Sequence, residues 1–382
     1  MADGSGEAIA KFTGHKVSSV KWRPVQRGSL VPSSIFVSGS WDQKDNVVSV
    51  WSTAQRNGVA SNEGADDLQA VQQPELVTSC RHDGDVTDIQ YFDEERFLVA
   101  SSQGSVSLMA HLPRDQTAIQ CVHRWEGLHH FQSGMHCPCT SIAVGMDTVA
   151  TVGEDGTINA LRINRSQPIW TAENADSCCL NAVLVLRASE LLTINSGRHL
   201  KVWDMRSPGK KHSKLMLMSG ESGSLNCAAK HPTQSHVVAC GDSNGVLSVW
   251  DMRQERYPVT LMEAHQDSIW DVRFHPLKPN HIFTCSQDGA AFHWDGSAQR
   301  SMQLASSGAV PSLLASRTTG DSISESNPWL SGDLVRSRVS VASLLPKNPL
   351  PVNSLDVDAL SNSVVLGTDS QAVCLVSGIT VQ

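Results

Sequence analysis

Five residues between positions 129 and 139 are of the types that bind zinc in proteins: His129, His130, His136, Cys137 and Cys139. Their spacing, HHFQSGMHCPC, matches no common structural zinc pattern, and Pro138 makes a chelating turn awkward. We therefore expect a polar connection whose two cysteines border a strand, with no metal and no other cofactor.

A second group, His265, Ser286 and Asp288, has the composition of a hydrolase triad. A triad needs a nucleophile that the substrate can reach, whereas these residues lie within or between short apolar strand patterns. We expect them to form a buried hydrogen-bond tetrad with Trp294, in which the four polar groups satisfy one another and hold the strands together. No G-x-S-x-G, P-loop or G-x-G-x-x-G motif occurs in a strand–helix context, so the sequence predicts no enzyme activity.

The strands that must position this tetrad lie between Ala264 and Asp295. They are Ile269–Phe274, His281–Cys285 and Ala290–Trp294. Residues alternate in the first of them with the period of a pleated strand, and Pro276 ends it because proline has no amide proton for a ladder. Asp288-Gly289 predicts a hairpin turn. A unit that begins with Ala-His and ends with Trp-Asp is typical of a WD40 repeat, which forms one four-stranded propeller blade.

Similar units recur along the whole chain. They cover 14–52, 81–111, 139–163, 177–206, 224–253, 264–295 and 351–378. Other units repeat only some of the tetrad residues. The first unit has His15 and Trp51, the fourth has Trp203 and the fifth has Trp250. Hairpin-turn spacings in the middle of the chain fit the ~40–45-residue period of WD40 repeats. The sequence therefore predicts an all-β, seven-bladed WD40 β-propeller that forms a single domain over 1–382.

The last unit shows only three strands, so the propeller needs a closing strand. Ala8–Thr13, the N-terminal strand 8–13, precedes the first unit and has no other partner, so we expect it to complete blade seven and cover its open edge. Long spacings place loop insertions near 53–73, 127–138 and 306–348. These segments are too polar to offset the entropy of ordering, so we expect loops there.

Composition limits the partners. The net charge of −8 predicts no direct binding of nucleic acid, and no apolar run approaches the ~20 residues of a membrane span, so we expect no membrane insertion.

Two W-D-x-R tetrapeptides end in Arg206 and Arg253. Proteins with this tetrapeptide often dock on the adaptor of a cullin-type ubiquitin ligase; alternatively, each arginine pairs with an aspartate of a neighbouring strand.

Ten short stretches carry a resemblance that goes beyond a general propeller. They are KWRP (21–24), GSWD (39–42), RHDGDV (81–86), VGEDG (152–156), NADS (174–177), HPTQSHVVA (231–239), LSVWDMR (247–253), HIFTCSQDG (281–289), SLLP (343–346) and VNSLDV (352–357). Through them the chain resembles the small WD40-repeat nucleoporins of the Y-shaped outer-ring complex of the nuclear pore. The inserted loops carry little of this resemblance.

The resemblance implies a non-catalytic scaffold at the nuclear pore of the nuclear envelope. It implies docking on helical-stack nucleoporins of the Y complex, especially the subunit nucleoporin eighty-five. It also implies roles in pore assembly and nucleocytoplasmic transport, and presence at the kinetochore in mitosis. Two other hypotheses stay open: a WD40 substrate receptor for a cullin-type ubiquitin ligase, and an enzyme or metal protein that uses the His/Cys loop.

Overall fold

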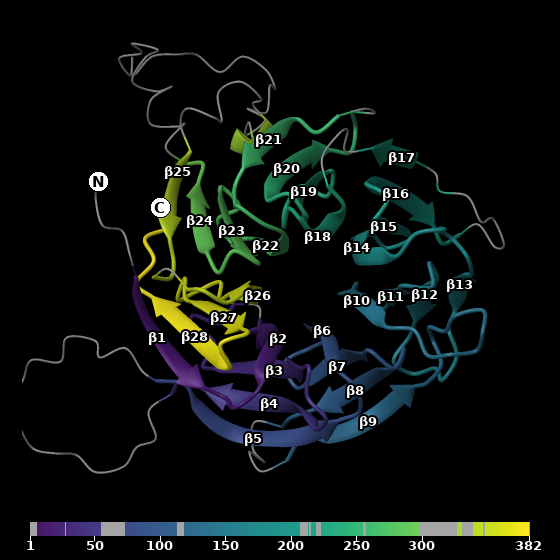
Figure 1. Ribbon diagram of the computed structural model, residues 1–382, viewed down its shortest axis with the longest axis horizontal. Coiled ribbons are helices and arrows are strands. Elements are labelled where there is room, and N and C mark those ends of the chain that lie inside the picture. Colours follow the sequence, from purple (N-terminus) through teal and green to yellow (C-terminus); the bar gives the residue numbers. More distant parts are fainter. Residues whose placement is uncertain are drawn as a thin grey trace, which may run out of the picture.

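The computed structural model describes residues 6–26, 28–54, 73–112, 118–206, 213, 215–218, 223–254, 257–297, 327–330, 339–346 and 348–381. These residues form seven four-stranded antiparallel sheets arranged as the blades of a closed ring (Figure 1). The helical element among them is a single 3₁₀ turn, η1 (Pro328–Leu330), and no helix of the described part is long and apolar enough to cross a membrane. The seven-bladed propeller that the sequence predicts is confirmed.

Each blade runs from an inner strand at the channel to an outer strand at the rim. Blade one contains β2 (Lys16–Trp22), β3 (Ile35–Trp41), β4 (Asn46–Ser52) and β5 (Glu75–His82). Blade two contains β6 (Val86–Tyr91), β7 (Arg96–Ser101), β8 (Val106–Ala110) and β9 (Gln120–Trp125). Blade three contains β10 (Cys139–Val144), β11 (Val149–Gly153), β12 (Ile158–Leu161) and β13 (Trp170–Ala172).

The same order continues through the second half of the chain. Blade four contains β14 (Leu180–Arg187), β15 (Glu190–Asn195), β16 (His199–Asp204) and β17 (Leu215–Met218). Blade five contains β18 (Leu225–Lys230), β19 (Val237–Asp242), β20 (Val246–Asp251) and β21 (Thr260–Glu263). Blade six contains β22 (Ile269–Phe274), β23 (His281–Ser286), β24 (Ala291–Asp295) and β25 (Ser340–Ser343). Blade seven contains β26 (Val352–Val357), β27 (Val364–Thr368), β28 (Ala372–Ser377) and β1 (Glu7–Phe12).

Blade seven is closed by the N-terminal strand, as the sequence predicts. β1 pairs antiparallel with β28, from Glu7 opposite Ser377 to Phe12 opposite Ala372. The Thr13 amide extends this pairing by donating to the Gln371 carbonyl at 2.8 Å. The two ends of the chain therefore share one sheet (Figure 1), and the inner strands of the last blade gain the edge partner that they lack in sequence order.

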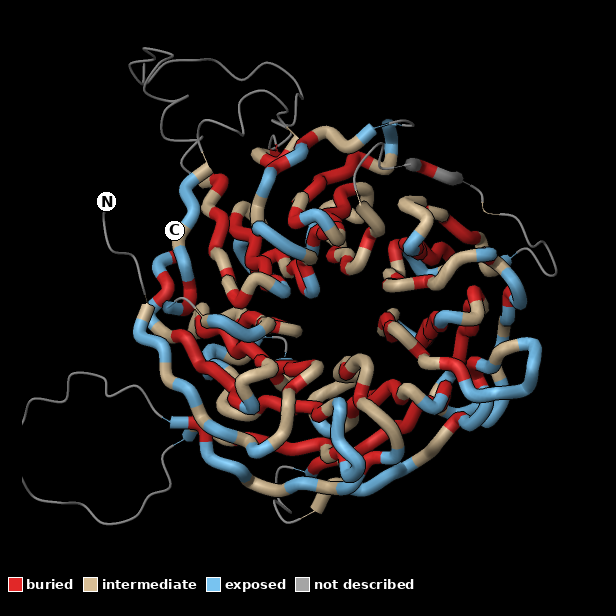
Figure 2. Tube along the Cα trace, in the orientation of Figure 1, coloured by how far each residue is buried: buried red, intermediate tan, exposed pale blue. Residues whose placement is uncertain are grey.

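The core lies within and between the blades, while exposed residues gather on the outer rim and on the connections (Figure 2). One core cluster joins blades five and six and contains both Trp294 and Trp329. Trp329 is fully buried. Its Nε1 donates to the Pro279 carbonyl at 2.9 Å, and its own carbonyl accepts from Thr260 Oγ1 at 2.6 Å.

This corrects the expectation of an unbroken polar loop over 306–348. Within that range, η1 inserts Trp329 into the core, and β25 supplies the outer strand of blade six by pairing with β24. A strand with one exposed face needs few apolar residues, so the sequence SVAS gave no clear signal. Most of the expected insertions near 53–73 and 306–348 fall outside the described residues. The 127–138 segment is described and is compact, with an isolated bridge between His130 and His136.

The ring has two faces that differ in their connections. We call the turn face the end at which every inner strand begins and at which the turns between second and third strands lie, such as those at Gly104 and Gly245. We call the loop face the opposite end, where the first strand connects to the second and the third to the fourth.

Candidate functional site

The tetrad of blade six is built around a buried histidine. His265 Nδ1 lies 3.2 Å from an Asp288 carboxylate oxygen, and His265 Nε2 lies 2.8 Å from Thr284 Oγ1. The Trp294 indole donates to the same threonine oxygen at 2.9 Å. These four side chains link the connection before β22 to β23, to β24 and to the turn between them.

Ser286 does not take the tetrad position that we expected. Its hydroxyl donates to the Asp267 carbonyl at 3.1 Å and accepts from the Asp288 amide at 3.1 Å. Thr284, two residues earlier on the same face of β23, is the hydroxyl between imidazole and indole. Side chains two residues apart share a face of a strand, so sequence alternation alone could not separate the two hydroxyls.

The same arrangement occurs in blade three, where the histidine is one of the zinc candidates. His129 Nδ1 lies 3.1 Å from Asp155 Oδ1, and His129 Nε2 lies 3.0 Å from Thr151 Oγ1. In both blades the threonine precedes the aspartate by four residues, which is the signal that could have revealed this site. Leu161 occupies the tryptophan position, so this tetrad lacks its indole.

The remaining zinc candidates do not converge on a common point. The Cys137 and Cys139 thiols are buried, and burial raises the pKa of Cys137 to about 12 and also raises that of Cys139 well above its usual value. Protonated thiols are poor metal ligands because zinc binds the thiolate. Across the described ranges, no group of three or more His, Cys, Asp or Glu side chains has the arrangement of a metal site.

The other tryptophans proposed for tetrads make simpler bonds. Trp51 donates to Ser38 Oγ at 2.8 Å, Trp203 to Thr193 Oγ1 at 2.9 Å, and Trp250 to Ser248 Oγ at 3.1 Å. His15 does not join Trp51, because its backbone rather than its ring bonds Thr13. Blades one, four and five therefore keep an indole–hydroxyl pair and lack the histidine–aspartate half.

The His265–Asp288 pair resembles a catalytic dyad, but its environment is structural. The His265 side chain has no exposed surface. Burial lowers its pKa although Asp288 opposes the shift, so the ring stays neutral at neutral pH. Burial alone would raise the pKa of Asp288, but the backbone N–H groups of Gln266 and Ala290 lower it overall. The hydroxyl beside His265 already accepts from Trp294, which leaves no nucleophile that a substrate could reach.

Both W-D-x-R arginines are held by the aspartate of their own tetrapeptide, rather than by one from a neighbouring strand. Arg206 Nε and Nη2 lie 2.9 and 2.6 Å from the two oxygens of Asp204. Arg253 makes the same bidentate pair with Asp251, at 2.9 and 2.7 Å. The Arg206 and Arg253 side chains remain 71% and 64% exposed. Each motif thus presents an oriented guanidinium at the loop face.

A channel with a volume of about 630 Å³ runs between the inner strands. Near the turn face, every inner strand has a β-bulge at the same place. The extra residues are Ser18, Thr87, Thr140, Asn181, Asn226, Trp270 and Asn353, and all of them line the channel. Six of these seven residues carry a short hydroxyl or amide side chain.

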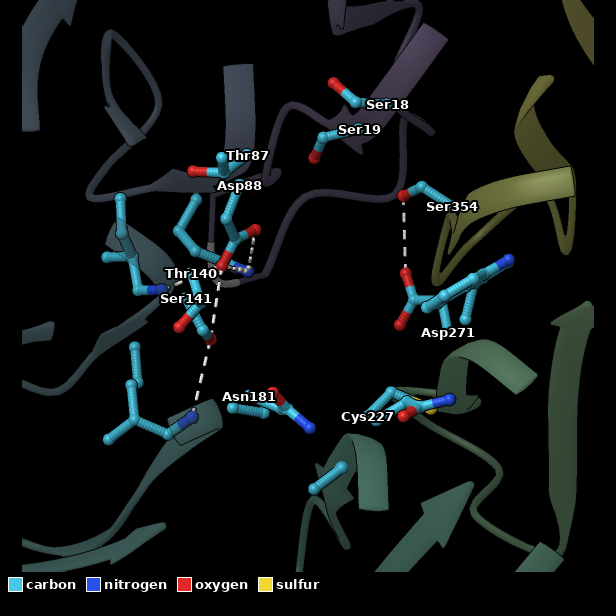
Figure 3. Close-up of a pocket in the computed structure, with 18 of the residues that line it drawn as sticks. Ser18, Ser19, Thr87, Asp88, Thr140, Ser141, Asn181, Cys227, Asp271 and Ser354 are labelled. Carbon is cyan, nitrogen blue, oxygen red and sulfur yellow. Dashed lines mark hydrogen bonds between the residues drawn. The ribbon is translucent and has the colours of Figure 1, made fainter. Parts of the chain in front are cut away.

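Five of the bulge residues tie their blade to the next one around the ring. Asn181 Nδ2 donates to the Leu225 carbonyl at 2.6 Å, Asn226 to Ile269 at 3.5 Å, and Asn353 to Val17 at 2.9 Å. The hydroxyls of Thr87 and Thr140 donate to the carbonyls of Cys139 and Leu180. Figure 3 shows Thr87, Thr140 and Asn181 around the channel.

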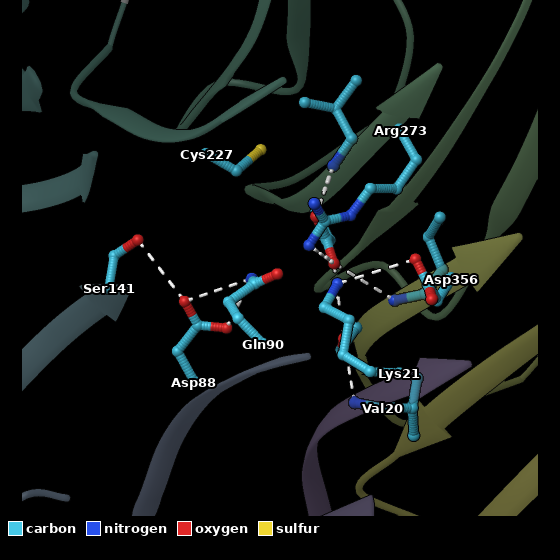
Figure 4. Close-up of polar contacts among 12 residues, drawn as sticks. Val20, Lys21, Asp88, Gln90, Ser141, Cys227, Arg273 and Asp356 are labelled. Atoms are coloured by element: carbon cyan, nitrogen blue, oxygen red, sulfur yellow. Dashed lines mark hydrogen bonds and ion pairs between the residues drawn. The ribbon is translucent and has the colours of Figure 1, made fainter. Parts of the chain in front are cut away.

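The next residue along several inner strands forms a second layer of such bonds. Asp88 accepts from the Ile142 amide at 2.8 Å, and Asp271 from Ser354 Oγ at 3.3 Å. Burial raises the pKa of Asp88. Deeper in the channel, Arg273 pairs with Asp271 at 3.3 Å and Lys21 lies 3.7 Å from Asp356 (Figure 4). The channel is thus lined by polar groups whose bonds hold the ring together, and we identify no nucleophile–base pair among them.

Comparison with protein families matches two segments of the chain. The family of the WD domain, G-beta repeat, covers residues 212–251 and 256–295. These segments contain β17 of blade four, all four strands of blade five and the first three strands of blade six, where the tetrad is complete.

Comparison with individual proteins matches nearly the whole chain. Nucleoporin Nup43 of Mus musculus is 40% identical over 378 residues, which cover 96% of this chain and 97% of the mouse protein. Nucleoporin Nup43 of Homo sapiens is 39% identical over the same shares. The nuclear pore complex protein nup43 of Dictyostelium discoideum is 28% identical over 154 residues, covering 40% of this chain and 36% of that protein.

Proposed function

This chain belongs to the Nup43 family of nucleoporins, and we propose that it is a non-catalytic scaffold subunit of the Y-shaped outer-ring complex. In this role it docks on the helical-stack subunits, especially nucleoporin eighty-five, and supports pore assembly and nucleocytoplasmic transport. It accompanies the complex to kinetochores in mitosis. The observation that carries the proposal is the identity of about 40% to the two mammalian proteins over almost the full length.

The architecture suits a scaffold. The polar side chains that could do chemistry, at His265, at His129 and along the channel, are engaged in bonds that hold strands or blades together. A rigid ring of this kind positions its connections precisely enough to form a stable interface, and connections rather than strands are the usual contact sites.

We assign the docking surface to the loop face because several large apolar side chains are exposed there, on connections of four different blades. Leu30 is 91% exposed and Met146 is 90% exposed, each in a connection from a first strand to a second. Leu277 and Tyr257 are further members of the same face. Such side chains are available for burial against a partner that spans several blades, and a stable scaffold interface buries ~1,200–2,000 Å².

Affinity purification from cells tests the proposal. The wild-type chain should recover outer-ring nucleoporins, including nucleoporin eighty-five. The double variant Leu30→Glu/Met146→Glu should reduce that recovery about tenfold or more, because buried apolar anchors dominate such interfaces. Met135→Glu is the matched control, since Met135 is also exposed but lies between β9 and β10 on the turn face. Failure of the wild type to recover any outer-ring nucleoporin would defeat the proposal.

The exposed, oriented arginines favour a second candidate function, as a substrate receptor for a cullin-type ubiquitin ligase. If they are the docking elements, Arg206→Ala/Arg253→Ala should abolish association with the ligase adaptor and leave the recovery of outer-ring nucleoporins unchanged. Adaptor recovery that is equal for wild type and double variant would exclude this use of the motif.

A further inference from the structure

One of the seven bulge residues that line the channel differs in type from the other six. At the position where the other inner strands carry serine, threonine or asparagine, β22 carries Trp270. Its indole makes no bond to blade seven; instead Nε1 donates to Gln287 Oε1 in the adjacent hairpin turn at 2.8 Å. The side chain that replaces an inter-blade bond is the largest of all and remains 41% exposed. An exposed aromatic ring at a position where other blades carry small polar groups breaks a local rule, and such a break marks a candidate functional position.

Trp270 lies where the channel opens at the turn face, and we call this opening the mouth of the channel. Trp41, the last residue of β3, lines the same cavity on the far side of blade seven. Its Nε1 donates to Asp369 Oδ1 at 3.1 Å, and Asp369 also accepts from Asn353 at 2.7 Å. The polar edges of both indoles are therefore fixed by hydrogen bonds, so each ring is held in place.

The charges at this mouth are negative. Asp369 lines it, and Asp267, which precedes Trp270 by three residues, is exposed. The basic residues of the cavity lining lie toward the loop face, where Lys230 Nζ donates to the Val185 carbonyl at 2.6 Å and Arg273 pairs with Asp271. The Trp41 ring already makes a cation–π contact, because Lys16 Nζ lies 5.3 Å from its centre. That lysine is neutralised by Asp42 at 2.7 Å.

We propose that the turn-face mouth of the channel binds an extended basic peptide segment of another protein, whose arginine side chain stacks on Trp270 and points toward Asp369. A planar guanidinium can stack on an indole and bond a carboxylate at the same time, which a lysine does less well. This surface is separate from the loop face to which we assign nucleoporin docking.

The probe is a nine-residue peptide with a central arginine flanked by glycine and serine, titrated calorimetrically into the full-length protein. The matched peptide carries citrulline, which keeps the shape and removes the charge. We expect the arginine peptide to bind about tenfold more tightly than the citrulline peptide, and about tenfold more weakly to Trp270→Asn than to wild type. Trp270→Phe should retain most of the affinity, whereas Asp369→Asn should weaken it.

Trp270→Asn restores the residue class found in the other blades, so its melting temperature should not fall; this separates lost binding from lost folding. Tyr257→Asn, an exposed aromatic on the loop face, should bind the peptide like wild type. The proposal is overturned if the wild type fails to bind the arginine peptide, if citrulline binds equally, or if folded Trp270→Asn and Trp270→Phe both bind as tightly as wild type.

Discussion

Asn353 in β26 donates its side-chain N–H to the backbone carbonyl of Val17 in β2, at 2.9 Å across the seam between blade seven and blade one. The two residues are 336 positions apart in the chain. The same amide donates to Asp369, which in turn accepts from Trp41. One asparagine thus connects the last blade to the first at the channel, while β1 connects the chain ends at the rim.

Asn353→Ala should destabilise the ring more than Asn226→Ala. Both remove a bulge amide, but Asn353 makes two bonds of 2.9 and 2.7 Å, whereas Asn226 donates to Ile269 at 3.5 Å. Loss of a well-formed partner for buried polar groups costs about 1–3 kcal/mol. Urea unfolding of the two variants measures the difference, and equal midpoints would show that these bonds do not support closure.

The hydroxyl at the centre of the tetrad can be tested directly. Thr284→Val keeps the shape but leaves both the His265 Nε2 and the Trp294 Nε1 without their partner, so we expect a loss of roughly 2–3 kcal/mol. Thr151→Val is the matched control in blade three, where one imidazole nitrogen loses its partner and no indole is involved. The free energy of unfolding should fall less for Thr151→Val than for Thr284→Val; the reverse order would contradict the assigned roles.

The sequence was sufficient for the fold because hairpin turns and alternating strands recur in all seven units, with a period of ~40–45 residues in the middle of the chain. The sequence did not reveal the tetrad of blade three, because loop lengths differ between blades. His265 precedes Asp288 by 23 residues, but His129 precedes Asp155 by 26, so the second tetrad did not match the first. The seven bulge residues at the channel could not be predicted either. A β-bulge is defined by the register between two strands, whereas a sequence shows only one strand at a time.

Trp329 is the clearest failure of sequence reasoning, and it gives a prediction. The residue lies in a polar stretch, yet it packs with Trp294 in the core between blades five and six. Trp329→Ala should cost ~3–5 kcal/mol, close to the effect of Trp294→Ala. Tyr257→Ala, at an exposed position, should stay within ~0.5 kcal/mol of wild type. Denaturant unfolding checks the order, and a wild-type midpoint for Trp329→Ala would show that this turn does not hold the core.

Two buried histidines predict how stability depends on pH. His231 Nδ1 accepts from the amides of Thr233 and Gln234 at 3.3 and 3.1 Å, so the folded protein holds this nitrogen unprotonated. His293 Nε2 lies 3.0 Å from His281 Nδ1, beside Asp295. Burial lowers the pKa of each, His231 and His293, from 6.5 to about 4.

The unfolded chain therefore binds more protons than the folded protein between pH 6.5 and 4. The stabilisation from each neutral histidine is fully present above pH 6.5 and is lost as the pH falls toward 4, by up to roughly 3 kcal/mol for each residue. Urea unfolding at several pH values should show this decline. In the variant His231→Gln/His293→Gln, both titrating groups are gone, so stability should fall less steeply across the same interval even though the variant is less stable at pH 7. An unchanged slope would mean that other groups, such as the carboxylates, control the acid sensitivity of the ring.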